Sequence, residues 1–142
     1  MFEAKFYARW ADMDFNGHMK NTAFLDYAAD CRMLFFKSKG FPMATFAKLR
    51  IGPVVFSDTI RYFKELFMYE PFYVRFLLQE INLEGSRFSI VNEICQMDGT
   101  LAALVESKSC WLDLDTRKII SPPDDLHAIV KNLGKTMDFK EN

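Results

Sequence analysis

The sequence predicts an α+β fold in which an antiparallel sheet wraps around one long central helix. Three features indicate it: an alternating segment at the N-terminus, one long apolar helical segment after it, and a series of alternating segments from Val54 onward. The 142 residues, 50% of them hydrophobic and 15% aromatic, suit a single domain with a sizeable core. The 15 phenylalanines are many for this length, and they fit an apolar cavity or a subunit interface as well as a core.

The N-terminal segment alternates apolar residues with residues that are mostly charged. A period of two is typical of a strand with one buried face. The following segment, Ala11–Lys20, is rich in Asp, Asn and Gly, which favour turns. We therefore expect a strand and then a loop, the buried face of the strand carrying Phe2, Ala4, Phe6, Ala8 and Trp10.

The segment Asn21–Lys39 predicts one long helix. Asn21 is expected to be its N-cap, and Gly40 occupies the position just after its C-terminus. Met43–Leu49 is expected to add a short helical turn. The apolar surface is wide enough to predict a helix covered on most sides, because two apolar stripes lie side by side: Phe24, Ala28, Cys31 and Phe35 in one, and Leu25, Ala29 and Phe36 in the other.

Four alternating segments follow, and turn signals at Glu84-Gly85-Ser86 and Asp98-Gly99 separate the later ones. We expect consecutive antiparallel strands over Val54–Lys64, Phe72–Ile81, Arg87–Gln96 and Leu101–Asp113.

The C-terminal part is expected to add little to the sheet. Pro122-Pro123 ends the strand region, and a short amphipathic segment, Leu126–Leu133, follows. The sequence therefore predicts one domain over residues 1–133 and a polar, mobile tail over residues 134–142.

Charge and hydropathy exclude two kinds of partner. Eighteen Lys and Arg against nineteen Asp and Glu give a net charge of −1, without the basic block that a nucleic-acid surface needs. No apolar run approaches the roughly 18 residues that span a bilayer, and the N-terminus lacks the apolar core of a signal peptide. We expect a soluble, cytoplasmic protein that binds neither nucleic acid nor the membrane interior.

Cofactor-binding patterns are also absent. The three cysteines lack CxxC spacing and are expected to be free thiols. His18 and His127 are the only histidines, too few for a His-rich metal centre. We expect no metal and no organic cofactor.

One stretch, Arg9–Asn21, carries candidate catalytic residues, because it holds Asp, Asn, His and Gly directly before an apolar helix. It could be a capping loop only, since Asp and Asn often occupy helix starts for local hydrogen bonding. It could also be a catalytic site. The unpaired N–H groups at a helix N-terminus can hold an oxyanion, and a nearby carboxylate can activate water or attack directly. Thioester hydrolysis requires little more, because the leaving thiol has a pKa of roughly 8.5.

The spacing of this stretch makes a more specific comparison possible. The run Arg9-x-x-Asp12-x-Asp14-x-x-Gly17-His18-x-x-Asn21, followed by a helix with Leu25, Tyr27 and Arg32, resembles the acyl-CoA thioesterases related to 4-hydroxybenzoyl-CoA thioesterase. The resemblance extends over nearly the whole chain, including Ile60-Arg61-Tyr62 and the Asp98-Gly99 hairpin. Met13 and Met19 depart from the residues of many relatives, which leaves the acyl specificity open.

The resemblance implies a hotdog fold that hydrolyses acyl-CoA thioesters, with subunits paired through their sheets as homodimers or homotetramers and active sites at the subunit interface. It assigns the catalytic carboxylate to Asp14 and the carbonyl-polarising backbone amide to Asn21. The acyl group and the carrier, CoA or acyl carrier protein, remain open.

Two other residues of the motif, Gly17 and His18, each have two possible roles. Gly17 supplies a positive φ for the turn or clears space for substrate, and both can hold. His18 either orients Asp14 or a water molecule or hydrogen-bonds the loop. Asp12 is expected to brace the loop, because two adjacent ionised carboxylates repel each other. Asn16 and Gly17 are candidate substrate-binding residues.

Arginine and lysine side chains are candidates for the phosphates of CoA. Arg61 is the one that we assign to substrate binding, while the other candidates are Lys64, Arg75 and Arg87. For each of them a solvated position on a strand is the competing interpretation.

Two alternative functions remain on the same fold. Enoyl-CoA hydratases of this fold have Asp-x-Asn, then proline, and a His five residues after the Asp. Asp14-Phe15-Asn16 matches the opening, but Gly17 replaces the proline and His18 comes four residues after Asp14. A non-catalytic acyl-binding protein would not need a carboxylate at the helix start.

Overall fold

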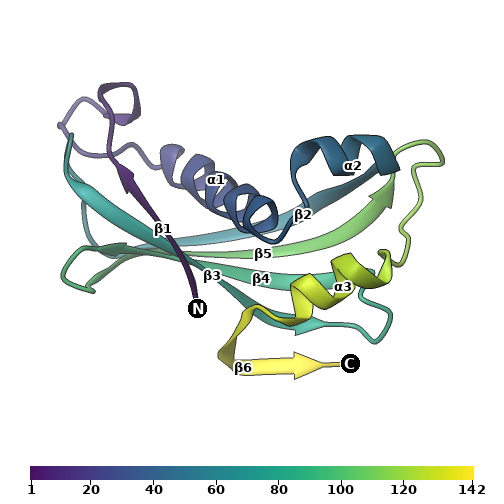
Figure 1. Cartoon of the computed structure of the whole chain (residues 1–142). Helices are drawn as coiled ribbons and strands as arrows, with labels where there is room; N and C mark the ends of the chain where they lie inside the picture. Colours follow the sequence, from purple (N-terminus) through teal and green to yellow (C-terminus); the bar gives the residue numbers. More distant parts are fainter.

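The computed structural model describes residues 1–142 as a curved six-stranded sheet with α1 and α2 lying over one face (Figure 1). The strand order is β1-β3-β4-β5-β2, and β6 pairs with β3 beyond the end of β1. The strands are β1 (Phe2–Tyr7), β2 (Ile51–Tyr62), β3 (Pro71–Ile81), β4 (Arg87–Gln96), β5 (Leu101–Asp113) and β6 (Gly134–Glu141). The helices are α1 (Ala23–Ser38), α2 (Met43–Leu49) and α3 (Asp124–Lys131), and one 3-10 turn spans Trp10–Asp12.

Helix α1 begins later than the sequence predicts. Its N-cap is Thr22 and not Asn21, and the Thr22 side chain makes no capping hydrogen bond. The backbone N–H of Ala23 donates to the carbonyl oxygen of Lys20 at 3.0 Å, so residues 21 and 22 form a turn. The helix ends as expected, because Gly40 follows it with a φ of +80°. Asp26 and Asp30 are exposed, so one side of the helix faces solvent.

The predicted strands from Val54 onward are confirmed, with bounds that differ by at most a few residues. Among these four strands, β3 pairs with β4 and β4 pairs with β5, both antiparallel. β2 does not lie beside β3 but pairs with β5, also antiparallel, at the edge of the sheet. Glycines with positive φ stand at both predicted turns, Gly85 at +76° and Gly99 at +94°. These glycines fit the left-handed backbone that such turns require.

Residues 134–142 do not form the mobile polar tail that the sequence predicts. Gly134–Glu141 is strand β6, which runs parallel to β3, so the sheet is not antiparallel throughout. The reason lies in the sheet edge. β1 pairs with Pro71–Phe76 only, and the backbone of Leu77–Ile81 would otherwise have a free edge. Backbone pairing of this kind does not require an apolar sequence.

The interior lies between α1 and the sheet and is rich in aromatic rings. Phe36 contacts Trp111 edge-on at a centroid distance of 5.9 Å, and Phe46 stacks on Trp111 at 5.8 Å. Trp10, by contrast, does not lie on the buried face predicted for β1. It is 75% exposed, because the strand ends at Tyr7 before the 3-10 turn.

The outermost strand, β2, leaves apolar side chains uncovered. Val54, Val55 and Phe56 are 36%, 39% and 55% exposed, and the other edge of β2 has no strand beside it. None of the helices is long and apolar enough to cross a membrane.

Candidate active site

The loop between β1 and α1 folds into a tight, hydrogen-bonded turn. The backbone N–H of Asp14 donates to the carbonyl of His18 at 2.8 Å, and the N–H of Gly17 donates to the carbonyl of Asp14 at 3.2 Å. Gly17 has a φ of +78°, with no atom within 4 Å of the position that a Cβ would take. The turn role expected for Gly17 is therefore confirmed, and the space on its open side is free.

Asp14 lies at the surface of this turn, and one of its two carboxylate oxygens accepts hydrogen bonds from the backbone. Its Oδ1 accepts hydrogen bonds from the backbone N–H groups of Asn16 at 2.8 Å and His18 at 3.1 Å. Its Oδ2 accepts no hydrogen bond from the protein and no cation pairs with it. The carboxylate is thus oriented by the backbone and retains one free oxygen.

The His18 side chain does not lie against Asp14. Its Nε2 is 3.4 Å from Oε2 of Glu65, and its ring meets Phe67 edge-on at 5.1 Å. Glu65 directly precedes Leu66. The carbonyl of Leu66 accepts a 2.7 Å hydrogen bond from the N–H of Met19, and this bond ties the loop to the segment between β2 and β3. Glu65 has no motif around it in the sequence, so only the fold identifies it as the partner of His18.

The start of α1 offers unpaired backbone donors. The N–H groups of Asn21 and Thr22 donate to no atom of the protein. The carbonyl of Asn21 accepts a 3.0 Å hydrogen bond from the hydroxyl of Tyr62, and the Tyr62 ring packs edge-on against Phe24 at 5.3 Å. Tyr62 thereby holds the turn that presents these amides.

A shallow, mainly apolar cavity of about 710 Å³ lies beside Asp14. Two of the side chains that line it project into solvent: Phe15 is fully exposed and Trp10 is 75% exposed. The cavity therefore places apolar surface next to Asp14. Its lining residues are Trp10, Ala11, Met13, Asp14, Phe15, Gly17 and Met68.

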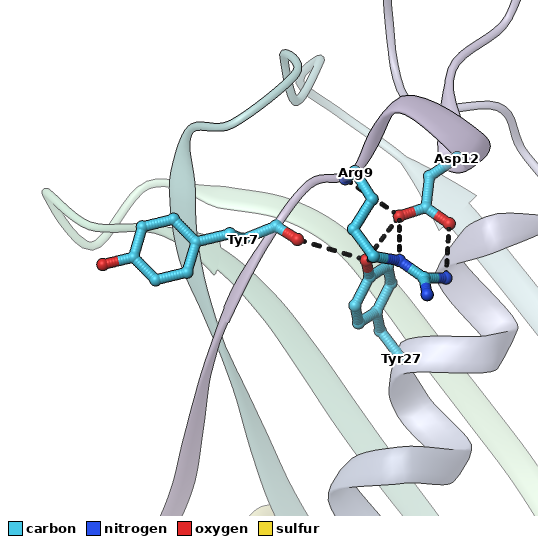
Figure 2. A network of polar contacts seen from close by, with 4 residues as sticks. All are labelled: Tyr7, Arg9, Asp12 and Tyr27. Atoms are coloured by element: carbon cyan, nitrogen blue, oxygen red, sulfur yellow. Dashed lines mark hydrogen bonds and ion pairs between the residues drawn. The ribbon is translucent and has the colours of Figure 1, made fainter.

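Asp12 is buried, in contrast to Asp14, and forms a polar network with Arg9 and Tyr27 (Figure 2). Its carboxylate accepts from the backbone N–H of Arg9 at 3.0 Å, from the Arg9 guanidinium, and from the Tyr27 hydroxyl. Burial alone would raise the pKa of Asp12, but the hydrogen bonds from Arg9 and Tyr27 bring the pKa below its usual value. Burial and the bond to Asp12 raise the pKa of Tyr27 to about 12. The expected brace is therefore an ionised carboxylate with a protonated tyrosine.

Two predicted substrate-binding residues make no side-chain contact with this site. The Asn16 side chain is exposed and makes no hydrogen bond. Arg61 pairs with Glu106 at 3.2 Å on the side of the sheet away from α1. The reason for the placement of Arg61 is strand alternation, because the next residue, Tyr62, points toward α1.

Two further observations concern cofactors and thiols. No group of three or more His, Cys, Asp or Glu side chains is arranged to hold a metal ion. Cys31, Cys95 and Cys110 are all free and buried.

Solved structures similar to this chain share the whole architecture. A hypothetical protein from Aquifex aeolicus is 22% identical with a TM-score of 0.84, and the match covers 92% of this chain and 99% of that one. A hypothetical protein from Staphylococcus aureus in complex with CoA is 18% identical with a TM-score of 0.86, over 98% and 89% of the two chains. A 1,4-dihydroxy-2-naphthoyl-CoA thioesterase from Synechocystis is 17% identical with a TM-score of 0.82, over 93% and 96%.

Sequence comparison gives the family. No curated protein matches the chain. Residues 8–130 match the family model of the thioesterase-like superfamily. The matched residues include the Asp14 loop, α1 and strands β2 to β5. The chain therefore belongs to the thioesterase-like superfamily.

Proposed function

We propose that this protein hydrolyses acyl-CoA thioesters, with Asp14 as the base or nucleophile. The observation that carries the proposal is the Asp14 carboxylate, which is oriented through Oδ1 and free at Oδ2 beside an apolar cavity. Membership of the superfamily supports the reaction class. The similar S. aureus protein in complex with CoA supports the carrier.

The reaction needs a polarised carbonyl as well as a carboxylate. The unpaired N–H groups of Asn21 and Thr22 are the proposed oxyanion donors, because they lie at the positive end of the α1 dipole. Asp14 removes a proton from water as the water oxygen adds to the thioester carbon, or its carboxylate adds to that carbon and water then cleaves the acyl-enzyme. In both routes the C–S bond breaks, and the thiolate leaves without a strong general acid.

The cavity suits an apolar acyl group, because its surface is mainly apolar and its lining includes Trp10, Phe15 and Met68. Aromatic, branched and long-chain acyl groups all fit this description. The phosphates of CoA would lie outside the cavity, where Arg61 remains a proposed contact only if a second subunit brings it near.

We also propose that the protein acts as a homo-oligomer, a dimer or tetramer, paired through β2. The exposed side chains of Val54, Val55 and Phe56 lie at the free edge of the sheet, and an unpaired edge next to apolar side chains favours pairing with another strand. Pairing there would bring a second chain close to Tyr62 and hence to the start of α1.

The hydratase alternative fits this geometry less well. Hydration would require an acid–base pair on one water molecule, yet the His18 imidazole lies against Glu65 and not against the Asp14 side chain. The non-catalytic alternative leaves the free carboxylate without a role.

A panel of aryl-, branched- and long-chain acyl-CoAs, assayed with a thiol-trapping dye, tests the proposed reaction. We expect release of free CoA from at least one class, at turnover rates of the order of 1 per second or above. A panel that includes acyl carrier protein thioesters and produces no thiol would contradict the proposal. Consumption of an enoyl-CoA without thiol release would favour the hydratase.

A further inference from the structure

We propose that Asp12 and Tyr27 are positioning residues, whose hydrogen-bonded pair fixes the distance between the Asp14 carboxylate and the free amides at the start of α1. The inference rests on the proposed function of Asp14. It assigns a catalytic consequence to two buried groups that do not line the cavity.

The side-chain network joins three parts of the fold at one carboxylate (Figure 2). Asp12 belongs to the loop, Arg9 follows β1, and Tyr27 comes from the second turn of α1. The Arg9 guanidinium contacts both oxygens of Asp12, with Nε 3.2 Å from Oδ2 and a terminal nitrogen 3.0 Å from Oδ1. The hydroxyl oxygen of Tyr27 also lies 3.2 Å from the carbonyl oxygen of Tyr7, at the end of β1.

The backbone of Asp12 reaches the start of the helix. Its carbonyl accepts a 2.7 Å hydrogen bond from the N–H of Lys20, and the carbonyl of Lys20 accepts the 3.0 Å bond from Ala23. Asn21, the first proposed oxyanion donor, directly follows Lys20. Asp14 follows Asp12 by two residues. One anchored residue therefore controls the position of both catalytic elements.

The exposed tip of the loop cannot supply this control itself. Residues 14 to 17 are exposed, and their hydrogen bonds are made within the turn: Asp14 to Asn16, Gly17 and His18. Such a turn keeps its own shape, but it can move as a unit unless the residues on either side of it are held in place. Asp12 is 3% exposed and its bond to the Tyr27 hydroxyl is buried, so this bond is shielded from water and holds the start of the loop firmly.

The effect on rate follows from the geometry that catalysis requires. A displacement of about 1 Å of a catalytic group can slow a reaction by about a hundredfold. Removing the Tyr27 hydroxyl leaves its ring, which packs against Phe6 at 5.1 Å and Phe72 at 4.9 Å. The Tyr27→Phe variant should therefore fold while losing the bond that ties Asp12 to α1.

The test compares Tyr27→Phe with Tyr73→Phe, which removes a hydroxyl from the opposite face of the sheet, where Tyr73 contacts Arg75 at 3.4 Å. For Tyr27→Phe we expect kcat per folded molecule to fall by about 10- to 100-fold, with KM changed by less than about threefold. Tyr73→Phe should retain wild-type kcat. Adding Asp12→Asn to Tyr27→Phe should lower kcat by less than the product of the two single effects, because both changes break the bond between Tyr27 and Asp12.

Amide hydrogen exchange provides a readout that does not depend on activity. In Tyr27→Phe, exchange should accelerate at the N–H groups of Asp14 and Lys20, which are hydrogen-bonded within the loop, and not in β4. Unchanged exchange at Asp14 and Lys20 would overturn the proposal even if no substrate were found. Wild-type kcat in Tyr27→Phe together with an inactive Asp14→Asn would overturn the positioning role alone. Full activity in Asp14→Asn would instead overturn the proposed function.

Discussion

Asp12 and Asp14 are two residues apart, yet the fold gives them opposite environments. Asp12 is 3% exposed and its carboxylate is fully engaged by Arg9 and Tyr27, whereas Asp14 is exposed and retains a free oxygen. The sequence distinguishes them only through the argument that adjacent carboxylates repel and through the family resemblance. Of the two, only Asp14 is accessible from solvent.

We expect Asp14→Asn to lower the turnover rate by a factor of about 10² to 10⁴, the range for loss of a general base. An Asn Oδ1 can still accept the hydrogen bonds from Asn16 and His18, so the turn should survive and KM should change little. Steady-state kinetics on the best acyl-CoA of the panel would measure both constants.

The matched control for that experiment is Asp30→Asn on the exposed face of α1, where the carboxylate makes no hydrogen bond or ion pair. It should retain wild-type turnover. Near-normal turnover in Asp14→Asn would mean that Asp14 only caps the turn.

At the scale of elements, a polar network ties the middle of α1 to the sheet. Arg32 donates from Nε to Asn92 of β4 at 2.8 Å and from a terminal nitrogen to Ser107 of β5 at 2.8 Å. Ser107 in turn donates to Asp58 of β2. Burial lowers the pKa of the Arg32 guanidinium, while the Asp58 carboxylate raises it. One serine hydroxyl thus links the helix to the edge strand.

We expect Ser107→Ala to lower the free energy of unfolding by about 1.5–3 kcal/mol, the usual worth of a hydrogen bond to a charged group. Ser107 is 1% exposed, so water cannot readily replace the lost hydroxyl as acceptor for Arg32. Urea denaturation would measure the change.

The same strand supplies the control. Ser109 is also 1% exposed, but its hydroxyl has no hydrogen-bond partner. Ser109→Ala should therefore leave stability unchanged or raise it slightly. Equal destabilisation by the two substitutions would show that the Ser107 network contributes nothing specific.

Most elements could be predicted from local patterns. The alternation in β4 and β5 gave their bounds to the residue, because both strands have one face on the core and turn residues at their ends. The start of α1 and the existence of β6 could not be predicted. The first depends on the bond of Ala23 to Lys20 in the loop, and the second depends on the uncovered edge of β3.

For the whole molecule, the free edge at β2 combines unpaired backbone with exposed apolar side chains. We expect a dimer or tetramer at micromolar concentration in analytical ultracentrifugation, because pairing would cover Val54, Val55 and Phe56. Phe56→Asp places a charge at this edge and should shift the population toward the monomer.

Met137→Asp is the control for assembly, because Met137 is fully exposed on β6, at the edge of the sheet opposite β2. It should assemble as the wild type does. A wild-type protein that sediments as a stable monomer would contradict both the oligomer and an active site shared between two subunits.

The sequence by itself determined the α+β class, a helix after the first strand, the four strands from Val54 onward and the loop that holds Asp14. These follow from the spacing of apolar residues and from turn residues, which are local properties. Only the tertiary structure decided that His18 meets Glu65, that Arg61 faces away from the site, that Tyr27 anchors Asp12, and that residues 134–141 close the edge of β3. Each of these features depends on residues from separate segments of the chain. Strand alternation and the open edges of the sheet determine them, and a local sequence pattern contains no information about either.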